Sequence, residues 1–225
     1  MARSTDRLLE TVDGMTDDDA HAPSLLPDWS RAHVLTHLAR NADGLANLAH
    51  WARTGEERAM YPGGTASRDA DIEAGAGRHI GDLRLDLADA SERLLGAFAD
   101  FPPAGLEREV HSRGGAWLGW EVPLMRVREV EIHHVDLEAG YAAGDWPDAF
   151  VRRTLDQLAP EFLSRDTCPV RTLQASEGGA WEVGATGPEL SGPAAELLSW
   201  LTGRSRGAGL SARPPGEVPP APRWR

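Results

Sequence analysis

The sequence contains no lysine, and all 23 of its basic residues are arginine. A mechanism that forms a Schiff base on a lysine of the protein is therefore excluded. Cys168 is the single cysteine, so the chain forms neither an internal disulfide bond nor a redox-active cysteine pair. We interpret Cys168 as a structural thiol rather than a nucleophile. Any thiol chemistry in this protein therefore depends on an external thiol.

The chain also lacks an excess of positive charge and any long apolar run. Its formal net charge of −12 at pH 7 disfavours nucleic acid as a partner, because the phosphates would repel it. No apolar segment has membrane-spanning length, and no apolar core follows the first residues as in a signal peptide. We expect a soluble, cytoplasmic protein that binds no membrane, and we expect a monomer. A length of 225 residues suffices for one or two domains.

A helix predicted from Arg126 to Glu138 places a carboxylate and an imidazole side by side. Pro123 suits the first turn of this helix, and Glu129 and His133 are one turn apart, so their side chains project from nearly the same side. They share that stripe with apolar residues, where an unpaired charge is costly. The pair is therefore a candidate for metal binding. An isolated pair of this kind is also typical of a solvated helix face.

A third ligand is available from a helix predicted over residues 30–54. Its apolar residues repeat with a period close to 3.6, and His37 lies at the edge of that face. A histidine in this position is often a hydrogen-bonded core residue. Together with Glu129 and His133, however, it would complete a set of two histidines and one carboxylate, which suits zinc and also iron, nickel or cobalt.

Neighbouring side chains carry weaker signals. Asp136 follows His133 by one turn and either orients an imidazole or is a solvated carboxylate. We expect His33 at the surface, His134 to pack or cap on a different helix face, and Trp29 to have a packing role.

The sequence resembles the mycothiol-dependent maleylpyruvate isomerase family, a branch of the DinB-like metal-binding four-helix bundles. The resemblance extends over nearly the whole chain, and the order of its motifs is specific. They are PSLLPDWS at 23–30, the segment 31–42 with its HL-x-x-NA pattern, Met60-Tyr61, RDADIE at 68–73, REVEIHHVDL at 128–137, SGPAAELLSWLTGR at 191–204 and PPAPRW at 219–224.

The resemblance implies roles for individual residues. His37, Glu129 and His133 stand at the family's metal-ligand positions, with zinc or another divalent metal as the expected ion. Arg68 stands at the position of a site arginine that grips an acidic part of the substrate or of the thiol. The loop predicted at 56–67 would cross the open end of the bundle, which places Tyr61 and Arg68 to contact the thiol cofactor. Arg68 is also expected to be catalytic. The family's cofactor is mycothiol, and its partners are this small thiol and a small acidic substrate.

The implied activity is conversion of maleylpyruvate to fumarylpyruvate, in gentisate degradation, by a metal-bound thiolate that adds to the double bond and then leaves. Two alternatives stay open. One is a related metal-dependent mycothiol S-transferase that acts on another electrophile. The other is a non-catalytic ligand-binding module.

The expected fold class is α+β, with an N-terminal DinB-like antiparallel four-helix bundle at 1–142 and a small α+β domain with a Pro-rich tail at 143–225. Helices are predicted over 5–14, 30–54, 69–101 and 126–138, with a loop at 56–67 and a hairpin or loop at 107–120. In the second domain we predict helices over 148–163 and 191–201, strands at 170–174 and 180–183, and an irregular end from residue 205.

Overall fold

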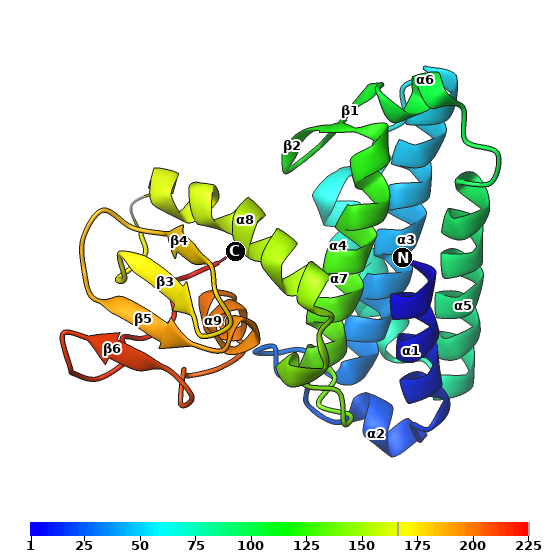
Figure 1. Ribbon diagram of the computed structural model, residues 1–225. Coiled ribbons are helices and arrows are strands. Elements are labelled where there is room, and N and C mark those ends of the chain that lie inside the picture. Colours follow the sequence, from blue (N-terminus) through cyan, green and yellow to red (C-terminus); the bar gives the residue numbers. More distant parts are fainter. Residues whose placement is uncertain (166, 225) are drawn as a thin grey trace. The chain divides into compact units, whose positions relative to one another are not determined.

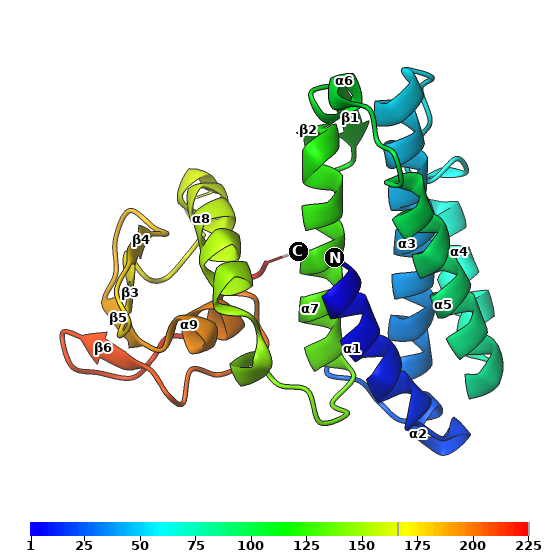
Figure 2. The same ribbon diagram turned by 45° about the vertical axis from the view of Figure 1, so that its right-hand side comes forward.

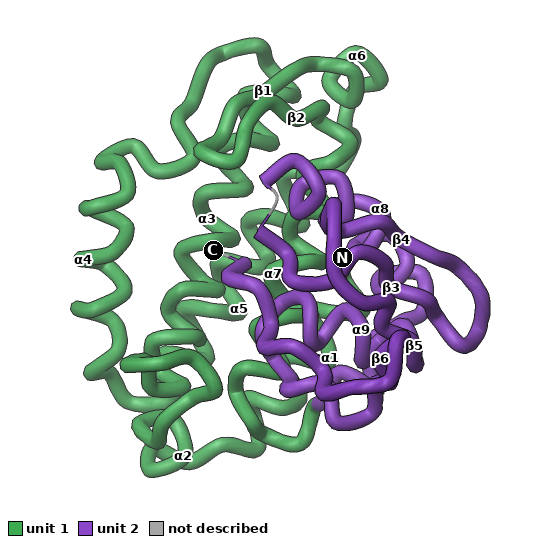
Figure 3. Tube along the Cα trace, turned by 90° about the vertical axis from the view of Figure 1, so that its left-hand side faces the viewer, with its two compact units in different colours: residues 1–141 green, residues 142–225 purple. Residues whose placement is uncertain are grey.

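The computed structural model describes residues 1–165 and 167–224. It divides the chain into two compact units, Met1–Tyr141 and Ala142–Arg225, here called unit 1 and unit 2 (Figure 3). Unit 1 is mainly helical, whereas unit 2 combines helices with a sheet, and the expected α+β fold class is confirmed. No helix in the described part of the chain has both the length and the apolar character needed to cross a membrane.

Unit 1 is built around a bundle of four helices (Figure 1). They are α1 (Ala2–Asp13), α3 (Arg31–Thr54), α5 (Ile80–Ala97) and α7 (Val122–Asp136). In Figure 1, α1 and α7 run in one direction, and α3 and α5 run in the other. Apolar residues of all four helices form one buried core, as expected when each helix has one apolar face. They include Leu8, Val12, Leu38, Leu45, Leu87, Leu94, Val122 and Val130.

The ends of α3 follow directly from its sequence. Ser30 and His33 form a reciprocal capping box at its start, and Gly55 ends the helix in the left-handed conformation, with φ of 83°. The short helix α2 (Asp17–His21), which precedes α3, begins with a capping box of its own between Thr16 and Asp19. These caps fix the position along the chain at which α3 begins, and hence the turn that carries His37.

The single helix expected over 69–101 is wrong, because the structure has two helices there. The first, α4 (Gly64–Ala76), ends at Gly77, and α5 begins after His79. The loop expected at 56–67 is accordingly shorter, since α4 starts at Gly64. Gly75 lets α4 lie close to α3, because a Cβ there would be 2.4 Å from the Cγ2 of Thr36. The helical crossover α4 explains how α3 and α5 come to run in the same direction.

A short hairpin leads into α7. Helix α6 (Pro103–Leu106) precedes it, and a 3-10 turn (Gly119–Glu121) follows it. Strands β1 (Glu109–Ser112) and β2 (Gly115–Leu118) pair antiparallel, which confirms the expected hairpin at this position. Pro123 lies in the first turn of α7, where its missing N–H has no helical partner to lose.

Unit 2 contains a sheet with the strand order β4-β3-β5-β6. In Figure 2, helices α8 (Asp148–Arg165) and α9 (Ala194–Leu201) lie on one face of that sheet. The predicted strand pair is confirmed as β3 (Thr172–Ala175) and β4 (Ala180–Glu182), which run antiparallel.

Two strands of unit 2 were not predicted. The first, β5 (Glu189–Gly192), pairs parallel with β3 and occupies residues expected to begin the last helix, which starts at Ala194. The second, β6 (Ser211–Arg213), lies in the end expected to be irregular and pairs antiparallel with β5. Both strands are short, and their pairing joins residues far apart in sequence, so local patterns do not reveal them.

Candidate metal centre

Helices α3 and α7 bring His37, Glu129 and His133 together. One ligand atom from each of these side chains lies within 4.8 Å of the others. The Nε2 atom of His37 is 3.1 Å from Oε2 of Glu129, and the Nε2 atom of His133 is 3.6 Å from the same oxygen. The two imidazole rings meet edge to face, with centroids 4.6 Å apart. The three residues selected from the sequence therefore converge on one point.

The electrostatic surroundings favour a cation at this point. Burial, reinforced by the neighbouring His133, lowers the pKa of His37 to about 4, so its ring is neutral at pH 7. Burial by itself would raise the pKa of Glu129, but the hydrogen bond from His37 and nearby positive charges hold that pKa well below its usual range. The centre thus offers neutral imidazole and ionised carboxylate, the forms in which these groups bind a metal.

The second ring nitrogen of His133 has an acceptor. Its Nδ1 atom is 2.7 Å from Oδ2 of Asp136, whose side chain is fully buried. A proton on Nδ1 that is donated to this carboxylate leaves the lone pair of Nε2 facing Glu129, which is the arrangement a metal-binding histidine requires. Asp136 therefore orients an imidazole, the first of the two interpretations left open by the sequence.

The second ring nitrogen of His37 has a donor instead. Nη2 of Arg68 lies 2.6 Å from the Nδ1 atom of His37. A guanidinium only donates hydrogen bonds, so Nδ1 is the acceptor and the proton of the neutral ring is on Nε2, from which it is donated to Glu129. The two histidines thus have opposite tautomers. The Arg68 contact is incompatible with a metal bond at Nε2 of the same neutral ring.

Removal of the Asp136 carboxylate is expected to weaken metal binding. In Asp136→Ala the affinity for Zn²⁺ should fall by about 10-fold to 100-fold, the usual cost of losing the acceptor of a ligating histidine. Asp136→Asn should lose less, because its amide oxygen still accepts from Nδ1. Competition with a chromogenic chelator measures both values. Glu73→Gln, which removes an exposed carboxylate on α4, is the control, and unchanged affinity in Asp136→Ala would refute the assigned role.

Arg68 and Tyr61 link the ligands to a neighbouring cavity. Arg68 lies in the first turns of α4, its guanidinium carbon is 6.0 Å from the centroid of the Tyr61 ring, and its Nη1 atom is 2.7 Å from Asp69. Burial and the charge of Glu129 raise the pKa of Tyr61, so its hydroxyl remains a hydrogen-bond donor. Gly44 admits this loop onto α3, since a Cβ there would be 2.9 Å from Tyr61.

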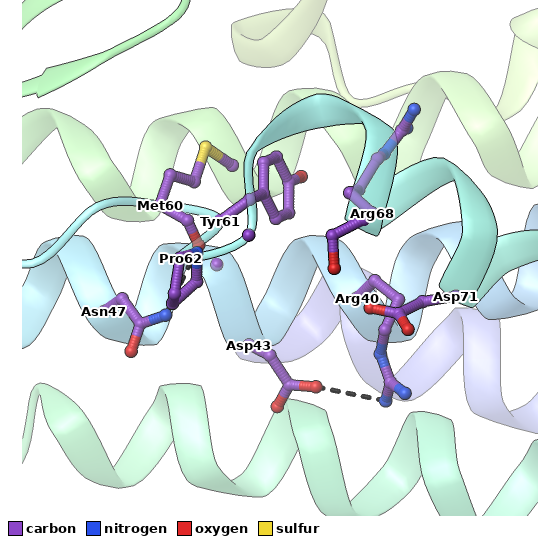
Figure 4. A pocket seen from close by; sticks show the side chains of 11 residues that line it. Arg40, Asp43, Asn47, Met60, Tyr61, Pro62, Arg68 and Asp71 are labelled. Atoms are coloured by element: carbon purple, nitrogen blue, oxygen red, sulfur yellow. Dashed lines mark hydrogen bonds and ion pairs between the residues drawn. The ribbon is translucent and has the colours of Figure 1, made fainter.

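The cavity beside these two residues has a volume of about 260 Å³ and a lining that mixes polar and apolar residues (Figure 4). Figure 4 shows the Arg68 guanidinium pointing away from Arg40 and Asp43, which form an ion pair within the cavity. The three metal-ligand candidates do not line it. Tyr61 and Arg68 therefore lie between this cavity and the candidate metal centre, a position from which either can contact a ligand.

Trp29 contacts the centre from another side. Its ring centroid is 5.7 Å from that of His37 and 6.0 Å from that of His33, and Trp29 and His33 line a second cavity of about 540 Å³. The ring of His33 serves the cap of α3, and that of His134 contacts the Thr11 hydroxyl at 2.8 Å. The sequence predicted a packing role for Trp29. Its position beside the ring of the candidate ligand His37 could not be predicted from local patterns and is seen only in the structure.

The fold and the converging side chains define a class, the four-helix bundle proteins with a candidate metal centre, here with an additional α+β unit. The model of the mycothiol maleylpyruvate isomerase N-terminal domain matches residues 1–138. The chain therefore belongs to the mycothiol-dependent maleylpyruvate isomerase family, as its motifs predicted.

Solved structures of this family resemble the chain over almost its full length. The crystal structures of the mycothiol-dependent maleylpyruvate isomerase and of a histidine-to-alanine variant each match with a TM-score of 0.93 and 29% sequence identity. Each match covers 99% of this chain and 93% of the other. No curated protein matches the sequence. The similarity includes both units.

Proposed function

We propose that this protein is a zinc- and mycothiol-dependent isomerase that converts maleylpyruvate to fumarylpyruvate. The observation that supports this proposal is the convergence of His37, Glu129 and His133 within 4.8 Å, in a chain of this family. Two neutral imidazoles and one carboxylate leave a divalent ion with a net positive charge and an open coordination position, which suits catalysis more than structural support.

A bound metal ion would lower the pKa of the thiol and so supply a nucleophile, whose reversible addition would make the double bond a rotatable single bond. The chain's own residues have separate tasks. His37, Glu129 and His133 hold the ion, and Asp136 fixes the orientation of His133. Arg68 has the geometry to bind a carboxylate of the substrate with two parallel hydrogen bonds, which orients the double bond for attack.

Tyr61 has a different task in this proposal. Its protonated hydroxyl is a donor beside Arg68, at the wall shared with the 260 Å³ cavity. Polar side chains such as Asn47 and Asp71 line that cavity, and such groups suit the hydroxyl groups of a sugar. We therefore place part of mycothiol against Tyr61 and Arg68. We also propose that the protein acts as a cytoplasmic monomer.

The test is a product analysis with the purified, zinc-loaded protein. Maleylpyruvate is supplied with mycothiol and without it, and fumarylpyruvate is followed by chromatography. Turnover that requires the thiol and regenerates it supports the proposal. Accumulation of a thiol conjugate would identify an S-transferase instead. Zinc binding without either product would refute both activities on this substrate.

A further inference from the structure

Arg126 is a buried guanidinium that the proposed chemistry does not use. It lies on α7, and its exposed fraction is 1%. Its Nη1 atom donates to the carbonyl oxygen of Leu38 at 2.7 Å and to Oδ1 of Asn41 at 3.0 Å, and its Nη2 atom donates to Oγ of Ser91 at 3.2 Å. All three acceptors are neutral. This side chain joins α3, α5 and α7 through hydrogen bonds alone.

The charge of Arg126 lacks a close counterion. Among the described residues, no carboxylate oxygen lies within ion-pair distance of Arg126, and its buried Nε atom has no hydrogen-bond partner. Burial lowers the pKa of Arg126 to about 10, so the side chain is still a cation at neutral pH. The carboxylates that favour its cationic form, Glu129 first and then Asp43, act from beyond ion-pair distance. A buried charge without a close partner is costly, and a neutral amide would join the same helices without that cost. The charge itself therefore calls for a functional explanation.

Arg126 is close to the metal centre through two of the helices. On α7 it precedes Glu129 by three residues, so the two side chains are neighbours on the helix surface. On α3 it binds the carbonyl oxygen of Leu38, the residue after His37. Charges interact more strongly in a buried region than in water, so this cation acts on any charge held at the centre.

We propose that Arg126 is an electrostatic positioning residue, a fixed positive charge behind the metal ligands that strengthens the binding of an anion at the metal. This inference rests on the metal site of the proposed function, where the anion is the ionised thiol. Arg126 touches neither metal nor thiol and acts through space. Its positive charge is expected to affect two affinities in opposite directions. It lowers the affinity for the metal ion, which it repels, and raises the affinity for the anion, which it attracts.

The inference can be tested by measuring azide binding to the cobalt-loaded protein, an experiment that does not depend on enzymatic activity. Co²⁺ gives the centre a visible absorption spectrum, and titration with azide gives a dissociation constant for an anion at the metal. In Arg126→Gln and Arg126→Met, azide should bind about ten-fold more weakly, the effect of one unit charge on another across roughly 10 Å at an effective dielectric constant of about 20. Both variants should bind Co²⁺ at least as tightly as the wild type.

A purely structural role predicts a different result. Loss of a brace between helices would weaken Co²⁺ and azide binding together and would affect Met more than Gln, which keeps hydrogen-bonding groups. Arg93→Gln is the control for total charge, because it neutralises an arginine whose side chain is 54% exposed, and its azide affinity should change less than about two-fold. Wild-type azide affinity in Arg126→Gln would overturn the proposal.

Ser91→Asp tests the charge while Arg126 stays in place. Oγ of Ser91 accepts from Arg126, so an aspartate there would pair with the guanidinium and compensate its charge. Azide affinity should again fall about ten-fold. This variant decides the question if the Arg126 variants do not fold, and wild-type azide affinity in it would count against the proposal. Failure of isomerase activity alone would leave these binding measurements valid.

Discussion

Replacing His37 with alanine is expected to abolish metal binding at the centre and to reduce thiol-dependent turnover by about 10³-fold or more, because a bound metal ion contributes several kcal/mol to such a reaction. His37 is the candidate ligand on α3, whereas Glu129 and His133 both belong to α7. Without it, an adjacent carboxylate and imidazole on one helix remain, and two ligands bind a divalent ion weakly. Metal analysis after gel filtration and the isomerase assay measure the two losses.

A matched control exists one turn earlier on the same helix. His33→Ala also removes an imidazole from α3, but the His33 side chain belongs to the capping box with Ser30. This variant should lose about 1 kcal/mol of stability and keep its metal. A His37→Ala protein that retains a full equivalent of zinc would remove His37 from the ligand set, and retained turnover would refute the metal-dependent mechanism.

Helical periodicity was sufficient to pair Glu129 with His133, because residues four positions apart on an α-helix are always neighbours on its surface. The position of His37 beside them depends on the packing of α3 against α7, which periodicity does not encode. The family motifs supplied that link. The fold class was predicted on the same grounds, since long amphipathic segments outweigh local irregularities.

The residues that local patterns missed depend on distant partners. Arg126 resembles any arginine in a helix until the burial of its side chain among Leu38, Asn41 and Ser91 is known. The break between α4 and α5 was also missed, although Gly75 and Gly77 are glycines in a predicted helix and weaken it. Their effect was underestimated because the apolar pattern of α5 extends smoothly from that of α4.

Arg68→Met is expected to have opposite effects on catalysis and on metal binding. Turnover, measured as kcat/KM for maleylpyruvate, should fall by about 10²-fold to 10³-fold, the usual loss when a charged partner of a carboxylate is removed. Zinc affinity should stay equal or rise by up to about ten-fold, because a competing hydrogen bond to His37 is lost. The chelator competition and the isomerase assay measure both on one preparation.

The reason is the tautomer of His37. While Arg68 donates to Nδ1, the proton of the neutral ring occupies Nε2, and a metal ion cannot bond there. A metal ion held at Nε2 would require the ring proton on Nδ1, where it would face the guanidinium donor of Arg68. Arg68 would then leave this contact and keep those with Asp69 and the face of Tyr61. It is then available to a carboxylate of the substrate.

Arg40→Gln separates this effect from a general change of charge. Arg40 lines the same cavity as Arg68 and also carries one positive charge, but it pairs with Asp43 and Asp86 and makes no contact with a candidate ligand among the described residues. Its loss should raise zinc affinity less than the loss of Arg68 does. If Arg68→Met lost zinc together with activity, the guanidinium would be supporting His37 as a ligand, and the exclusion between the two contacts would be wrong. A rise in zinc affinity together with a fall in turnover would mean that Arg68 alternates between His37 and the substrate. Binding of the metal would then release the arginine that positions the double bond.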